Sequence, residues 1–264
     1  MKPQRSCGRT LLLGLIGLVG LCVIAAAFWW EQHRGQLLPP PVPRFPTAPP
    51  YTPWATPPVA TTFDFPLLPA RAYGPLSNTR YGDQNPAFGE RANCFRTISG
   101  DSVPFSQLYH AGVDLFALND VGQVVWGACK HAPVHAVGDG VVVFLVDAGA
   151  EGQVMGIEHL LPDGSRVYSV YWHVDHVQVR EGQPVTRGQV ISVVHDMSWN
   201  SHLHWEMRTF RDGSNLFPAG TAGARGTCNR QIPGVGYTWD DDPARAHPDY
   251  YGYLDPIAFV EGHR

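Results

Sequence analysis

Residues 153–173 read QVMGIEHLLPDGSRVYSVYWH, a stretch typical of two antiparallel strands joined by a tight turn. Pro162-Asp163-Gly164 is a turn sequence, and the residues from Arg166 to His173 alternate in polarity for much of their length. More strands are expected on both sides, in residues 132–146 around Gly138-Asp139-Gly140 and in residues 178–192 between turn glycines. Six or more short strands, and no long amphipathic helix after Trp30, predict an all-β fold. We expect a compact antiparallel sheet or sandwich with long loops.

Composition supports this fold class and excludes one class of partner. The 264 residues include 28 Gly and 24 Pro, and only 16% are charged, which suits a β-rich and loop-rich chain better than a helical bundle. The formal net charge is −4, and no basic run follows the N-terminal residues. A nucleic-acid-binding surface is therefore not expected.

The N-terminal residues are expected to reach a membrane. Residues 1–10 contain three basic residues and are predicted to be cytoplasmic, whereas residues 11–30 are uncharged and end with two tryptophans. A helix of this length spans about 30 Å, the thickness of a bilayer core. The alternative is a cleavable signal peptide with its cleavage site at Ala25-Ala26-Ala27. Either reading places the rest of the chain outside the cytoplasm, in the cell envelope if anchored and secreted if cleaved.

Residues 31–60 are expected to form a linker. Its second half, from Pro39 onwards, is dominated by proline, which predicts an extended polyproline II spacer. A proline-rich ligand for a partner domain is the alternative that this composition leaves open. Residues 61–264 then form the globular domain.

Three of the five cysteines fall in that domain: Cys94, Cys129 and Cys228. Their wide spacing excludes a CxxC metal site. In an oxidising compartment we expect one disulfide and one remaining thiol, and all three pairings stay open.

Two histidine-containing stretches point to metal chemistry. In Ser201-His202-Leu203-His204-Trp205-Glu206-Met207, a predicted strand, both imidazoles lie on one face. In residues 109–117, His110 and Asp114 lie where a turn is expected to lead into a strand. Same-face histidines also occur on solvated sheets, but a second His/Asp pair favours a metal site.

Four elements occur in sequence: His110-x-x-x-Asp114, Tyr171-Trp172-His173, the Val-x-x-Gly-x-x-Ile run from Val185 to Ile191, and His202-Leu203-His204. Their order resembles that of the lysostaphin-type zinc endopeptidases, also called LytM-domain peptidoglycan hydrolases. The resemblance covers a motif core at residues 109–207, with a closing strand expected at residues 255–260.

The resemblance implies a site and a reaction. His110, Asp114 and His204 would bind one Zn²⁺ ion per domain, while His173 and His202 would be the catalytic histidines. Three protein ligands leave a position for water, whose attack on a peptide bond needs a proton acceptor and a stabilised oxyanion. Which of the two catalytic histidines is the base stays open. The implied substrates are peptide stems or cross-bridges of cell-wall peptidoglycan, and envelope proteins are candidate partners.

Other residues receive weaker assignments. Glu206 shares the strand parity of His202 and His204, so it is a candidate hydrogen-bond partner for a histidine, with a simple structural role as the alternative. The remaining histidines are expected to be surface, satisfied core, linker or terminal residues: His33, His131, His135, His159, His176, His195, His247 and His263.

The chain also departs from the family pattern around the expected cleft. Trp172 replaces a small residue, the run SVVHDMSWNS before His202 lacks glycine, and residues 119–130 and 208–254 resemble insertions. Substrate preference is therefore the least constrained property. A non-catalytic module that binds cell-wall peptide or activates an amidase is the alternative function. The complete set of five site residues favours the enzyme.

Overall fold

The computed structural model describes residues 57–84, 95, 97, 99–211 and 236–264. The expected anchor at residues 11–30 and most of the expected linker lie outside these residues, as do Cys94 and Cys228. Within the described residues, no helix is both long enough and apolar enough to cross a bilayer.

The hairpin predicted from residues 153–173 is confirmed. Strand β6 (Gln153–Leu160) pairs antiparallel with β7 (Arg166–Asp175), with Ile157 opposite Ser169. The turn between them is closed by Asp163, whose side chain accepts a hydrogen bond from the backbone N–H of Ser165 at 2.9 Å. Gly164 has φ +85°, a conformation that glycine adopts without steric cost.

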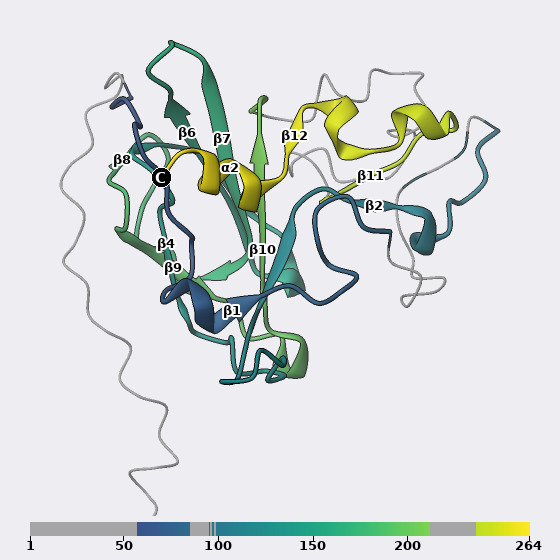
Figure 1. Cartoon of the computed structure of the whole chain (residues 1–264), viewed down its shortest axis with the longest axis horizontal. Coiled ribbons are helices and arrows are strands. Elements are labelled where there is room, and N and C mark those ends of the chain that lie inside the picture. Colours follow the sequence, from purple (N-terminus) through teal and green to yellow (C-terminus); the bar gives the residue numbers. More distant parts are fainter. Residues whose placement is uncertain (1–56, 85–94, 96, 98, 212–235) are drawn as a thin grey trace, which may run out of the picture. The chain divides into compact units, whose positions relative to one another are not determined.

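The described strands form one large antiparallel sheet and one small one, which confirms the expected β architecture (Figure 1). The order along the large sheet is β1 (Tyr73–Gly74), β3 (Val113–Ala117), β10 (Leu203–Arg208), β7, β6, β5 (Gly140–Asp147) and β8 (Pro184–Val185). Off this path, β12 (Tyr253–Leu254) pairs with β10, and β4 (Pro133–His135) pairs with β9 (Val190–Val194), which also pairs with β7. The small sheet joins β2 (Tyr109–His110) to β11 (Tyr237–Thr238).

Helical structure among the described residues is short. It comprises the 3-10 helices η1 (Ala70–Ala72), η3 (Phe105–Gln107), η4 (Gly149–Glu151), η5 (Ser198–Asn200), η7 (Pro243–Arg245) and η8 (Pro248–Tyr251), and the α-helix α2 (Pro256–Gly262).

Strand β10 lies between β3 and β7 and is buried on both faces. Leu203, Trp205 and Met207 point into the main hydrophobic core. Because side chains alternate along a strand, His204 and Glu206 face the opposite side. One strand therefore supplies core packing with one set of residues and polar groups with the other.

The closing strand predicted at residues 255–260 is wrong, because these residues begin helix α2. The Asp255 side chain accepts hydrogen bonds from the backbone N–H groups of Ile257 and Ala258, and Pro256 occupies the first helical turn. An Asp cap followed by proline is a helix start signal, which outweighs the β character of the apolar run behind it. The helix packs against β10.

The two strands predicted around Gly138-Asp139-Gly140 exist, but they are not partners. Strand β4 pairs with β9, whereas β5 pairs with β6 and β8. A Gly-rich turn thus marks the end of one strand and the start of another without specifying their pairing.

Cys129 is a buried free thiol that donates a hydrogen bond to the Leu115 carbonyl at 3.5 Å. Burial raises the pKa of this thiol to about 12. Of the three pairings left open by the sequence, the one without Cys129 involves two residues outside the described part of the chain.

His159 is a satisfied core residue, as expected for this position. Its ring is fully buried, with Nδ1 2.8 Å from the Asp139 carbonyl and Nε2 2.7 Å from the Ser169 hydroxyl. Burial lowers the pKa of His159 to about 4. The folded chain therefore binds a proton here much more weakly than the unfolded chain, whose histidines titrate near pH 6.5.

We expect His159 to make folding sensitive to acid. The contribution of neutral His159 to the free energy of unfolding is fully present above about pH 6.5. It is lost as pH falls towards about 4, which lowers the free energy of unfolding by up to about 3 kcal/mol. Urea unfolding at several pH values, with a chelator present, should show a shallower pH dependence in His159→Gln than in the wild type. Parallel curves for the two proteins would contradict this assignment.

Candidate metal centre

A glycine turn brings the first two site residues to the centre of the sheet. Gly112 lies between His110 on β2 and Asp114 on β3. A Cβ atom at Gly112 would lie 2.5 Å from the Trp205 carbonyl oxygen and 3.0 Å from His204 Nε2. Only glycine lets the backbone pass this close to β10, so the turn fixes the two ligand candidates beside that strand.

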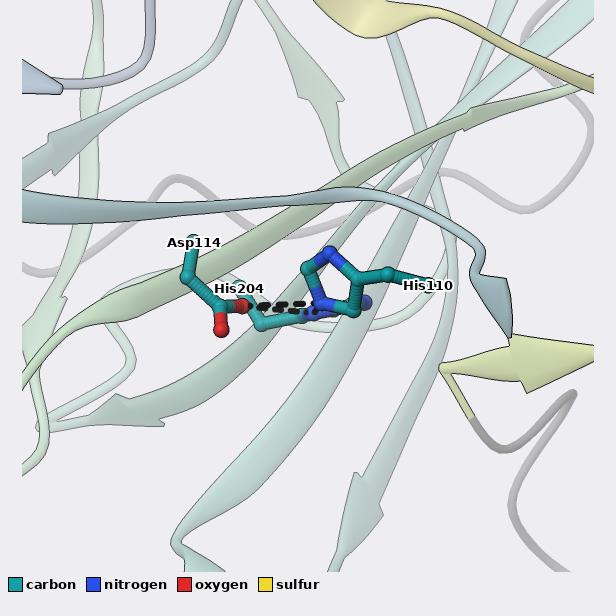
Figure 2. Close-up of side chains that lie close together, drawn as sticks. All are labelled: His110, Asp114 and His204. Atoms are coloured by element: carbon teal, nitrogen blue, oxygen red, sulfur yellow. Dashed lines mark hydrogen bonds and ion pairs between the residues drawn. The ribbon is translucent and has the colours of Figure 1, made fainter. Parts of the chain in front are cut away.

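Strand register supplies the third residue. Asp114 on β3 is directly opposite His204 on β10. The Asp114 Oδ1 atom is 2.9 Å from His204 Nδ1 and 3.1 Å from His110 Nε2, and the two nitrogens are 2.8 Å apart. Figure 2 shows the carboxylate and the two rings converging on one point. All three side chains are buried, and these are the residues that could hold a metal ion within the described part of the chain.

The outward-facing nitrogen of each ring is already engaged. His110 Nδ1 is 3.3 Å from the Arg80 carbonyl oxygen, and His204 Nε2 is 2.9 Å from Glu206 Oε1. Carbonyl and carboxylate oxygens only accept hydrogen bonds, so these nitrogens carry the hydrogens. The inward nitrogens then face each other and the Asp114 carboxylate. These three ligand atoms, within about 3 Å of one another, repel unless a proton or a metal cation lies between them.

The arrangement fits zinc. Two imidazole nitrogens and one carboxylate oxygen form a catalytic type of zinc donor set, with bonds of about 2.0 Å and a fourth position open. Tetrahedral donors at that bond length lie about 3.3 Å apart, close to the spacing seen here. Burial alone would raise the pKa of Asp114, but His110 and His202 hold it well below its usual range, so the residue is a carboxylate.

A buried ion pair supports His204 from behind. Glu206 and Arg208 are both fully buried, and Arg208 Nε donates to Glu206 Oε2 while Glu206 Oε1 accepts from His204. Burial alone would raise the pKa of Glu206, but Arg208, together with His204, lowers it. The guanidinium itself lies over the rings of Phe210 and Tyr253, 5.3 and 5.5 Å from their centroids. The expected histidine contact of Glu206 is present, whereas nothing in the sequence pointed to Arg208.

The carboxylates of Asp114 and Glu206 favour positive charge at His204. Burial lowers the pKa of this ring, but hydrogen bonds to Asp114 and Glu206 outweigh burial and raise the pKa to about 9. Without a metal ion His204 Nδ1 therefore carries a proton that it donates to Asp114, and a metal ion bound there would displace this proton. Two carboxylates on either side of one imidazole thus create a site that stabilises a cation.

His173 reaches the centre through a β-bulge in β7. Gln153 on β6 pairs with Val174, but Met155 pairs with Tyr171, so one residue of β6 faces two residues of β7. His173 has φ +58°, which is unusual for a residue with a side chain and re-aims the imidazole. Its Nδ1 donates to the Glu151 carbonyl at 2.9 Å, which leaves Nε2 as an acceptor.

His202 lies just before β10 and faces His173, with ring centroids 4.8 Å apart. Its Nδ1 donates to the Asn200 carbonyl at 2.6 Å, and its Nε2 is 3.7 Å from Asp114 Oδ1. The ring stacks on Phe116 at 4.8 Å with an interplanar angle of 27°. His202 therefore borders the candidate metal position with a fixed tautomer.

Both of these histidines are neutral at physiological pH. Burial, followed by the neighbouring His202, lowers the pKa of His173 to about 3, and burial also lowers the pKa of His202. Each offers an Nε2 lone pair that can accept a proton.

The structure brings all five predicted site residues and Glu206 together, from β2, β3, β7, β10 and the position just before β10. The side chains of the other described histidines are not part of this cluster and have different partners. His135 contacts the Pro66 carbonyl, and His195 lies 3.4 Å from Asp175. His33 is outside the described residues.

The described end of the long insertion reaches the site. Strand β11 pairs Tyr237 with His110, and the two rings are 5.3 Å apart. A Cβ atom at Gly236 would lie 3.3 Å from His204 Nε2. Trp172 covers another side, opposite His204 in register with ring centroids 6.1 Å apart. Large aromatic residues thus border the metal position on two sides.

These features define a buried His/Asp cluster that could hold a metal ion, on an antiparallel sheet and flanked by two neutral histidines. Residues 109–218 match the profile of Peptidase family M23. This part of the chain is therefore an M23, or LytM-type, domain, and the resemblance drawn from the motifs is confirmed. No curated protein sequence matches the chain significantly.

Several solved structures resemble the chain distantly. A zinc containing peptidase from Vibrio cholerae is 27% identical, with 56% of this chain and 37% of that chain covered and a TM-score of 0.35. CbpA from L. salivarius REN is 16% identical, with coverages of 77% and 97% and a TM-score of 0.43. The catalytic domain of lysostaphin from Staphylococcus simulans is 17% identical, with coverages of 67% and 95% and a TM-score of 0.33. The chain thus spans little more than a third of the Vibrio cholerae peptidase.

We expect the Glu206 carboxylate to strengthen metal binding by holding the His204 ring. Replacing Glu206 with Gln should weaken zinc affinity about 10- to 100-fold, measured by competition with a chelating dye. The double variant Glu206→Gln/Arg208→Met should show the same loss, because it removes the carboxylate without leaving an unpaired buried guanidinium.

Glu158→Gln is the matched control, since Glu158 also pairs with an arginine, Arg166, on the same sheet. Its zinc affinity should equal that of the wild type. Wild-type affinity in the double variant would show that Glu206 does not support the ligand.

Proposed function

We propose that this protein is a zinc-dependent endopeptidase that hydrolyses peptide stems or cross-bridges of bacterial cell-wall peptidoglycan. The observation that carries the proposal is the convergence of three atoms able to ligate a metal, His110 Nε2, Asp114 Oδ1 and His204 Nδ1, beside two neutral histidines. The M23 domain supports the reaction class.

His110, Asp114 and His204 would hold the ion. When bound there, zinc supplies Lewis-acid activation of water and of a peptide carbonyl. The protein's own residues orient the ligands and shield the site. Glu206 and the Arg80 carbonyl keep the ligand rings oriented, and the aromatic residues around the site limit access of bulk water.

His173 and His202 would accept and donate the proton during the reaction. Each has its Nδ1 hydrogen committed to a backbone carbonyl, so each presents Nε2 as a base. A histidine that accepts a proton at Nε2 becomes a donor at that atom. It can then stabilise the developing oxyanion or protonate the leaving amine. Two adjacent rings therefore suffice for both proton steps, and either can act as the base.

The cellular setting is part of the proposal. Residues 11–30 would anchor the chain in the membrane, residues 31–60 would act as a spacer, and residues 61–264 would work outside the cytoplasm, where peptidoglycan and envelope proteins lie. The support is the uncharged run of spanning length, the basic residues before it and the proline-rich stretch after it.

Incubating the full chain with purified cell walls and identifying the released muropeptides by mass spectrometry tests the function. Release of peptides with a new N-terminus identifies an endopeptidase and the bond it cuts. Binding to the walls without release, by a zinc-loaded protein, would instead support the non-catalytic module.

Substitutions should distinguish the metal-ligand residues from the two catalytic histidines by their effects on zinc content and rate. His110→Ala, Asp114→Ala and His204→Ala should lose most of the bound zinc, because two donors hold it far more weakly than three. His173→Ala and His202→Ala should keep zinc but lose about 10²- to 10³-fold in rate. Metal analysis and muropeptide release are measured on the same samples.

His135→Ala serves as the control, since this strand histidine contacts only a distant loop carbonyl, and it should keep both properties. Loss of zinc from His173→Ala or His202→Ala in proportion to the loss of rate would mean that the ligand set has been misassigned.

A further inference from the structure

A row of aromatic side chains runs from His202 to the protein surface. Phe116 stacks on His202, Trp126 lies 5.5 Å from Phe116, and Trp199 lies 5.5 Å from Trp126, measured between ring centroids. We call Phe116, Trp126 and Trp199 the aromatic row. Phe116 is buried, whereas 51% of Trp126 and 65% of Trp199 is exposed to solvent. Exposing two neighbouring indoles to water is unfavourable, and such patches commonly mark binding sites.

The row is held in place by two loops that contact each other. Trp126 belongs to the insertion at residues 119–130, and Trp199 belongs to η5 before His202. A Cβ atom at Gly127 would lie 3.0 Å from the Ser198 carbonyl oxygen, so the loops meet beside the two tryptophans. Lys130 and Asp196 form an ion pair of 3.8 Å between the same loops. The indoles are therefore presented on a fixed surface.

The same loop that carries Trp199 also orients His202, through the Asn200 carbonyl. A molecule bound on the aromatic row would therefore lie next to the proposed catalytic histidine. The row is continuous with the candidate site.

The surroundings of the row favour one kind of occupant. Charges of both signs border it, because exposed Asp196 and exposed Lys130 pair between the two loops that carry the indoles. An anionic membrane surface would be matched by an excess of cations, which this rim does not have. The two partly exposed indoles cover far less than the area of about 800 Å² per partner that a stable protein interface buries.

A saccharide matches this chemistry. A pyranose ring offers a face of C–H groups that packs on an indole, and its edge carries hydroxyl and amide groups that hydrogen-bond to a polar rim. Two indoles inclined at 63° can contact two successive sugars whose ring planes also differ in orientation.

We propose that the aromatic row is a glycan subsite, which binds the amino-sugar strand that carries the scissile peptide. The inference rests on the proposed function for the identity of the sugar. It assigns a role to residues 119–130 and to the glycine-free run before His202. It also places the glycan on the Phe116 side of His202.

Binding is tested with the full chain and a β-1,4-linked N-acetylglucosamine tetramer, by calorimetric titration. Trp126→Ala and Trp199→Ala should each weaken binding tenfold or more, and Trp199→Phe should recover most of the loss because it restores a stacking surface. Tyr250→Ala is the control, since Tyr250 is also an exposed aromatic residue (59%) but lies on η8. Thermal unfolding confirms that each variant is folded.

Activity gives a second readout that separates this inference from the proposed function. The wild type and the double variant Trp126→Ala/Trp199→Ala are compared on cross-linked peptides with and without their sugars. The double variant should lose about tenfold in kcat/KM on the glycan-linked substrate and little on the free peptides.

Each outcome has one meaning. If the wild type cuts neither substrate, the endopeptidase proposal fails, and the titration alone decides the glycan subsite. Equal losses on both substrates would overturn the subsite in favour of a peptide-binding surface. No tetramer binding by the wild type, or binding of anionic vesicles that depends on the two tryptophans, would also overturn it.

Discussion

The structure depends on the pairing of Asp114 with His204 across strands β3 and β10. This one register places a carboxylate against an imidazole in the middle of the sheet, and it simultaneously sends Leu203, Trp205 and Met207 into the core. A slip by one residue would turn the metal-binding face inward and bury unpaired polar groups. The hydrophobic effect on one face of β10 therefore enforces the geometry of the chemistry on the other.

A second constraint is common to the four imidazoles of the site. Each has one ring nitrogen held by an oxygen acceptor, from Arg80, Glu151, Asn200 or Glu206. Each therefore directs its other nitrogen towards the centre. Three of these acceptors are backbone carbonyls, that of Arg80 in a bend and those of Glu151 and Asn200 at the ends of η4 and η5, so the conformation of these short segments sets the tautomers. The segment before His202 has two roles, because it orients a histidine and also presents Trp199 to solvent.

Local sequence patterns predicted the structure correctly where an element depends mainly on its own residues. The hairpin of β6 and β7 follows from alternation and a Pro-Asp-Gly turn, and the separation of ligands from core residues on β10 follows from strand parity. The same reasoning failed at residues 255–260, where apolar content suggested a strand although Asp255 and Pro256 begin a helix. It also failed to pair β4 with β9, because partners distant in sequence leave no local trace.

The sequence by itself determined the residue types of the site, their order and the face on which His202, His204 and Glu206 lie, since strand periodicity is a local property of the backbone. The resemblance to the lysostaphin-type endopeptidases was also visible in the sequence, in the residues of four motifs and their order. Only the tertiary structure decided which nitrogen of each ring faces the centre, that a bulge aims His173, that Arg208 backs Glu206, and that Trp126 meets Trp199. These are contacts between segments distant in the chain, and they form only when the sheet brings those segments together.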